Sequence, residues 1–354
     1  SLSLFLSAAL MFTVQPMTGK MLLPLVGGTP AGWIVTIAFF QLALLAGYYL
    51  AHALARLTPR RHALVYLLGL LAGLFFLPLD LHVGLHTGVP LQVDITLMLA
   101  IAIGVPFVAL SATSSTLQRL FTETGHPSAH DPYFLYAASN LGSLAGLFAY
   151  PLLAEPLAGL KLQACLWHGG FTMLALLALG CLLLAHNGGK AVPTQTLAAA
   201  GAGNKERLQW VLLAFVPSCT LSALTTQLST DIFSTPMIWV LPLGVYLLSF
   251  VLAFRHKETI SPDLLARLHP AMVAIALGLL ITQHMMLKMS WTAVGFHLLS
   301  FGWIALLCHR LLAARRPADS RKSLTDFYLM IALGGALGGT LNAFVFPHVF
   351  DRLI

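Results

Sequence analysis

The chain has 354 residues, of which 58% are hydrophobic and 9% are charged, and its mean hydropathy is +0.85. Roughly a quarter of the residues in a soluble domain are charged, so this composition excludes a soluble globular protein and predicts an integral membrane protein. The net charge of +7 comes from basic residues in short loops, which is typical of a topology signal and not of a nucleic-acid-binding protein.

Apolar segments follow one another along the whole chain, each about 20 residues long, the length that a helix needs to cross a bilayer. They lack the alternating pattern of a membrane barrel. We therefore predict an all-α, polytopic membrane protein with about eleven transmembrane helices. The predicted spans are 2–24, 30–55, 62–80, 93–120, 132–154, 161–186, 208–229, 236–254, 268–286, 290–313 and 325–348.

The turn after the first span recurs later in the chain. Thr29 suits a helix N-cap, Pro30 suits the first helical position, and Trp33 follows. The same spacing returns at Thr235, Pro236 and Trp239 before the eighth span. Further matches pair Gln118-Arg119 with His309-Arg310, and Asp131-Pro132-Tyr133 with Asp326-Phe327-Tyr328.

These matches divide the chain into two related halves. Residues 187–206 are rich in Ala, Gly and Thr and lack aromatic residues, which predicts a flexible linker. Residues 1–186 then form a six-helix half and residues 207–354 a five-helix half. An even number of helices separates the repeats, so they are parallel, which is the major-facilitator-like plan. Basic loops alternate with nearly uncharged ones and place the N-terminus in the cytoplasm.

Intramembrane charges usually face the interior of a helix bundle or a wet cavity. Lys20 lies toward the end of the first span, and Asp231 lies just beyond the end of the pseudo-equivalent seventh span. We predict that the two pair across the centre or that Lys20 holds an anionic group; the alternative is that both reach the outer headgroups. Further candidates for binding a substrate are Gln15, beside Pro16, and the polar pair Thr226 and Gln227.

Asn140 lies in the middle of the fifth span, ahead of Gly142 and Gly146, and the eleventh span carries Gly334, Gly335, Gly338 and Gly339. The small-xxx-small spacing predicts close helix packing, with Asn140 either bridging two helices or contacting a substrate. The spaced histidine pairs, His82 with His86 and His126 with His130, fall in loops rich in Gly or Pro, so we predict no metal site. The absence of a nucleotide loop or a nucleophile set predicts no cofactor and no catalytic residue, so we lean against enzyme activity.

Two glycine-containing segments and one acidic turn carry a resemblance to a known family. Ser139–Leu147 with Tyr150–Pro156, Ser229-Thr230-Asp231 with Trp239–Leu243, and Asp326-Phe327-Tyr328 with the glycines that follow are similar to the membrane region of bacterial fused major-facilitator/spermidine-synthase-like proteins. The resemblance implies the bacterial inner membrane and, in that family, a soluble synthase-like domain after further helices. Nothing in this chain resembles that domain.

Two functions follow as expectations. The first is a transporter-like protein that binds or moves a small solute, anionic or neutral, in a central cavity. A polar centre containing Gln15, Lys20 and Asn140 would favour it. The alternative is a non-catalytic membrane anchor or accessory subunit for a synthase-like enzyme or a larger complex, which a closed apolar centre would favour. The expected partners are the lipid bilayer, a solute, and a partner subunit or C-terminal domain, with no nucleic acid.

Overall fold

The computed structural model describes residues 1–26, 30–81, 88–122, 124, 126, 133–188, 203–231, 240–254, 261–286, 291–317 and 320–349. This part of the chain is almost entirely helical, and seven of its helices are long and apolar enough to cross a membrane. The shorter helix Val240–Ala253 is also apolar. The all-α membrane architecture predicted from composition is therefore confirmed.

The helices of the N-terminal half, α1 to α8, form six consecutive continuous helical segments, each of one helix or of several joined end to end, which are called rods below. Three of these rods are single helices near the N-terminus, α1 (Leu2–Val26), α2 (Pro30–Leu54) and α3 (Pro59–Leu74). The fourth rod joins α4 (Leu91–Leu99), the π-helical turn η1 (Ala100–Gly104) and α5 (Val105–Thr122). The fifth joins α6 (Tyr133–Ala149), η3 (Tyr150–Ala154) and α7 (Glu155–Leu157), and the sixth is α8 (Leu160–Gly188).

The C-terminal half, α9 to α14, forms five more rods. They are α9 (Asn204–Asp231), α10 (Val240–Ala253), α11 (Pro262–Met286), α12 (Trp291–Ala314), and α13 (Ser320–Thr340) continued by η4 (Leu341–Val345) and α14 (Phe346–Val349). Each rod corresponds to one predicted span. The main boundary difference is the third: α3 begins at Pro59, which suits the first position of a helix, and it ends at Leu74, ahead of the residue before Pro78, where helical backbone is disfavoured.

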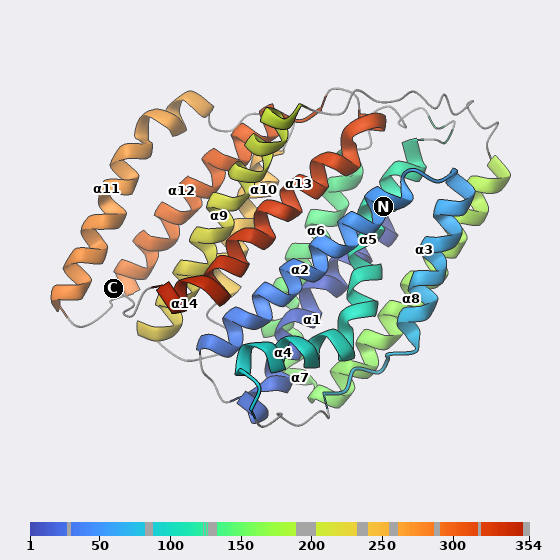
Figure 1. Cartoon of the computed structure of the whole chain (residues 1–354), viewed down its shortest axis with the longest axis horizontal. Helices are drawn as coiled ribbons and strands as arrows, with labels where there is room; N and C mark the ends of the chain where they lie inside the picture. Colours follow the sequence, from blue (N-terminus) through green and yellow to red (C-terminus); the bar gives the residue numbers. More distant parts are fainter. Residues whose placement is uncertain are drawn as a thin grey trace.

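The two halves lie side by side, with α3 and α8 at one end of the long axis and α11 at the other (Figure 1). Within the N-terminal half, α1 packs on α6, α2 on α5, and α3 on α5. Six rods later the same contacts recur: α9 packs on α13, α10 on α12, and α11 on α12. The repeated contact pattern matches two parallel pseudo-repeats.

Glycines make the strongest of these repeated contacts possible. A Cβ on Gly142 or Gly146 of α6 would clash with backbone atoms of Phe5 or Ala9 of α1, respectively. A Cβ on Gly334 of α13 would likewise clash with the carbonyl oxygen of Val211 on α9. The predicted small-xxx-small packing is therefore confirmed in both halves, where it brings helix backbones together.

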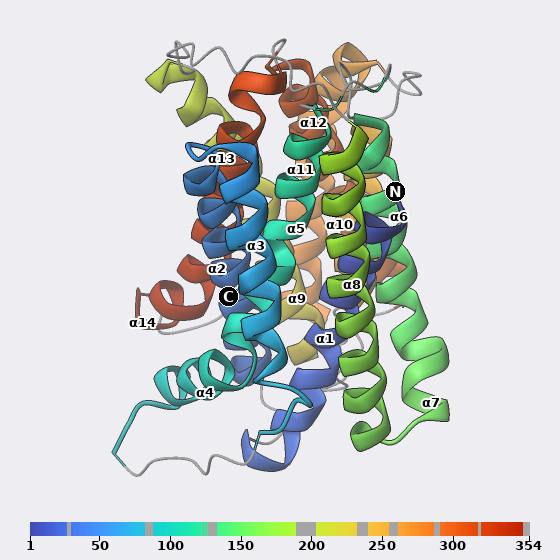
Figure 2. The ribbon, with the colours of Figure 1, turned by 90° about the vertical axis from the view of Figure 1, so that its right-hand side faces the viewer.

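One face of the molecule, at which α2, α5, α8, α10 and α12 end, carries most of the described cations and is called the basic face below; it is at the top in Figure 2. Its described cations include Arg56, Arg60, Arg61, Arg119, Lys205, Arg207, Arg267, Arg315 and Arg316. The opposite face, where α1 and α7 end, carries Lys20, Asp80, Asp94, Glu155 and Lys161. This asymmetry is the pattern that the loop charges predicted.

Candidate functional site

Lys20 has a partner that sequence reasoning did not consider. Its ammonium forms an ion pair with the carboxylate of Glu155, the first residue of α7, and the two side chains are 23% and 28% exposed. Both residues belong to the N-terminal half and lie near the opposite face. Lys20 therefore has a local partner between α1 and α7, and its pairing with Asp231 or with an anion stays a prediction. The side chain of Asp231 lies outside the described part of the structure.

The other predicted binding residues are not brought together around Lys20 among the described contacts. The Gln15 amide donates to the Met11 carbonyl of its own helix at 3.1 Å, and the Thr226 hydroxyl donates to the Ser222 carbonyl at 2.9 Å. Such bonds within one helix satisfy polar groups locally. Asn140 and Gln227 are half-buried on α6 and α9.

A polar contact crosses between the halves in the middle of α2. The Gln41 amide nitrogen donates to the hydroxyl of Ser218 on α9 at 3.1 Å, and that hydroxyl donates to the Gly335 carbonyl of α13 at 2.9 Å. A Cβ on Gly339 would occupy the position of the Gln41 amide oxygen, so this glycine makes room for the side chain. That oxygen is buried and has no hydrogen-bond partner among the described atoms.

The same pair of helices also closes toward the basic face. Tyr48 of α2 stacks on Tyr328 of α13 with ring centroids 6.0 Å apart, and His52 Nδ1 lies 3.1 Å from the Thr325 hydroxyl. Around them, a buried cluster contains Trp210, Phe250 and Phe327 of the C-terminal half. Tyr48 therefore docks a side chain of the N-terminal half into an aromatic cluster of the other half.

A second contact between the halves joins α6 to α10. Leu147 of α6 packs in one buried cluster with Val240 of α10 and Trp33 of α2. A Cβ on Gly244 of α10 would lie 3.3 Å from the ring of Phe148. Because α2 and α10 are repeat partners, as are α6 and α13, the α2–α13 and α6–α10 contacts are related by the same repeat; we call them the two seams.

Sequence reasoning missed the seam residues because hydropathy marks which residues lie in the membrane and not which helix faces meet. A polar residue such as Gln41, in the middle of an otherwise apolar span, was the available signal. Pairing it with Ser218 on the seventh span requires a contact between residues 177 positions apart. Glu155 was missed because it lies one residue beyond the predicted fifth span, 132–154.

Comparison with known proteins agrees with this architecture. No protein-family profile matches the chain, and the search of curated proteins finds no match. Among solved structures, the proton:xylose symporter XylE of the major facilitator superfamily, bound to 6-bromo-6-deoxy-D-glucose, aligns with a TM-score of 0.55 at 13% identity over 99% of this chain and 88% of its own. A POT family transporter in complex with a thioalcohol-conjugated peptide aligns with a TM-score of 0.53 at 13% identity, covering 98% and 90%.

These similarities extend over nearly the whole length of both partners, and at this identity they show the fold. They agree with the repeated helix contacts, which were established from the chain itself. The protein is therefore a multi-pass membrane protein whose fold is similar to that of the major-facilitator structures.

Proposed function

We propose that the protein is a carrier that moves a small solute between its two halves by opening and closing the seams in turn. The observation that carries this proposal is the Gln41–Ser218 contact, a hydrogen bond between α2 and α9 at mid-span, which lies beside the α2–α13 seam. A carrier needs contacts between halves that can be broken and re-formed, and a single hydrogen bond contributes only about 1 kcal/mol net.

The mid-span side chains favour a neutral, hydrogen-bonding solute. Lys20 is paired with Glu155, and the other predicted candidates with described side chains, Gln15, Asn140, Thr226 and Gln227, are amides or hydroxyls, as is Gln41 at the seam. The buried Gln41 oxygen accepts no described hydrogen bond and is a ready acceptor for a solute hydroxyl or amide. We propose further that the basic face is cytoplasmic and that the membrane is a bacterial inner membrane, as the charge asymmetry and the family resemblance suggest.

The test measures the distance between the two halves at each face of the protein, and it does not require the solute to be known. Spin labels would be placed in pairs on a variant whose four native cysteines are replaced by serine. One pair, at the exposed residues Arg61 and Lys205, spans the halves at the basic face; the other, at Leu157 and Trp291, spans them at the opposite face. A carrier should give two distance populations at each face.

The populations should shift in opposite directions when a mixture of sugars, peptides and amino acids is added in lipid nanodiscs. Uptake of radiolabelled members of that mixture into proteoliposomes would then identify the solute. A single distance at both faces under all conditions would contradict the carrier and favour the anchor or accessory-subunit function, which needs no alternation.

A further inference from the structure

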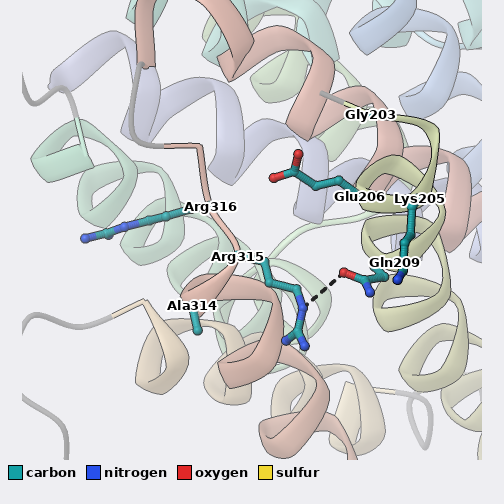
Figure 3. A pocket seen from close by; sticks show the side chains of 7 residues that line it. All are labelled: Gly203, Lys205, Glu206, Gln209, Ala314, Arg315 and Arg316. Carbon is teal, nitrogen blue, oxygen red and sulfur yellow. Dashed lines mark hydrogen bonds between the residues drawn. The ribbon is translucent and has the colours of Figure 1, made fainter. Parts of the chain in front are cut away.

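A hollow opens at the basic face, where α9 begins and α12 ends. It has a volume of about 520 Å³ and opens widely to the surface between the first turns of α9 and the end of α12. Gly203, just before α9, and Lys205, Glu206 and Gln209 of α9 line one side; Ala314, the last residue of α12, and Arg315 and Arg316, which follow it, line the other (Figure 3).

Cations outnumber anions in the lining of this hollow. Lys205, Arg315 and Arg316 bring three positive charges to its lining against the single negative charge of Glu206, and of the two arginines it is Arg315 that points toward Gln209, whereas Arg316 extends away from it (Figure 3). The first turn of α9 also faces the hollow, and the amide groups at a helix N-terminus favour an anion. The electrostatic environment therefore selects a negatively charged ligand.

The Arg315 guanidinium is held in place before any ligand arrives. Its Nε donates to the Gln209 amide oxygen at 3.3 Å, and its Nη1 donates to the Leu311 carbonyl at 3.1 Å. The indole of Trp210, which is fully buried, donates to the Arg315 carbonyl at 3.0 Å and joins this end of α12 to α9. A guanidinium fixed in this way binds a phosphate at a lower entropic cost than a mobile side chain.

We propose that this hollow binds a phosphate group, with the headgroup of an anionic phospholipid as the expected source. The site lies at the ends of two helices that are long enough to span a membrane, and, on the orientation proposed above, at its cytoplasmic side, where basic pockets between helices hold such headgroups. A soluble phosphate ester offers the same chemistry from the aqueous side. The proposal does not depend on the solute that the carrier moves.

The experiment is native mass spectrometry of the full chain released from detergent micelles with phosphatidylglycerol or phosphatidylcholine. We expect one phosphatidylglycerol molecule to be retained in preference to phosphatidylcholine. The variant Arg315→Gln/Arg316→Gln should weaken that retention by about 25-fold, because each cation near an anionic surface contributes about fivefold in affinity. Glu206→Gln should change retention in the opposite direction and strengthen it.

Arg60→Gln/Arg61→Gln is the matched control, because it removes two exposed arginines from the same face without touching the hollow. This control should retain the lipid as the unmodified protein does. Inorganic phosphate at millimolar concentration separates the two sources: if it displaces the lipid at the same site, the ligand is a soluble phosphate, and if it does not, the ligand is the headgroup. Equal loss of retention in both double variants, or no loss in either, would overturn the site.

Discussion

At the scale of single residues, variants of the Lys20–Glu155 ion pair can distinguish a structural role of Lys20 from a role in binding the solute. Lys20→Met leaves Glu155 without its cation, and Glu155→Gln leaves Lys20 without its anion, so each single variant should unfold at a lower temperature. The double variant should regain part of the loss, with a coupling free energy of about 1 kcal/mol for a partly exposed pair.

Thermal unfolding in detergent measures this coupling, and solute uptake gives the second measurement. If the pair is structural, the double variant should transport as the unmodified protein does. If Lys20 instead contacts the solute, the double variant should stay inactive even where its stability has recovered. Lys161→Met, which changes an exposed lysine on the same face, is the control for loss of a positive charge.

Gly339 makes a second prediction at the residue scale. A methyl group at this position would displace the Gln41 amide oxygen, so Gly339→Ala should break the Gln41–Ser218 hydrogen bond and shift the protein away from the closed α2–α13 seam. Gln41→Leu should shift the same equilibrium by removing the hydrogen bond from the other side. The distances between spin labels at Arg61 and Lys205 report this shift, and unchanged distances in both variants would argue against a role for Gln41.

At the scale of helices, two adjacent glycines of α13 differ in what surrounds them. Gly334 faces the backbone of α9, whereas a Cβ on Gly335 would have no atom within 4 Å. Gly334→Ala should therefore destabilise the protein by about 1–3 kcal/mol through overpacking. Gly335→Ala should be neutral or should stabilise it by up to about 1 kcal/mol, because alanine favours the helix.

Thermal unfolding of the two variants side by side provides the comparison, and Gly180→Ala on α8, where the space is also open, is a second control. Equal destabilisation by Gly334→Ala and Gly335→Ala would mean that the α9–α13 crossing does not depend on close backbone contact. The result would then also weaken the equivalent crossing of α6 on α1 at Gly142.

The helices themselves were predictable, because length and hydropathy determine a membrane span almost independently of its neighbours. The glycine faces were also predictable, since small residues spaced four positions apart in a membrane helix typically allow another helix to approach closely. What could not be predicted was the partner of each polar group. Lys20 meets Glu155 because the fifth rod continues past its π-helical turn η3 to place that carboxylate beside α1. The hydropathy of the sequence placed the end of this span before Glu155 and did not predict that the helix continues.

At the scale of the whole molecule, the repeat relates the two seams, so we expect them to behave alike. The π-helical turns η3 and η4 follow the glycine faces of α6 and α13 at nearly the same distance, so the two rods are alike in shape as well as in packing. Rods of the same shape at the two seams permit one half to rock against the other while each crossing within a half stays rigid. Motion should therefore appear between the halves and not within them.

Tyr48 is where this expectation is tested most directly, because its ring is the N-terminal half's contribution to an aromatic cluster that otherwise belongs to the C-terminal half. Tyr48→Ala removes that stacking, and aromatic pairs contribute about 0.5–1.5 kcal/mol beyond the area they bury. The α2–α13 seam should open more often at the basic face, which would lengthen the Arg61–Lys205 distance. Tyr49→Ala changes the neighbouring ring, which is 64% exposed on the outer side of α2, and should leave that distance unchanged. If both variants lengthen it equally, loss of an aromatic ring from α2 loosens the helix itself, and the Tyr48–Tyr328 stack does not hold the halves together.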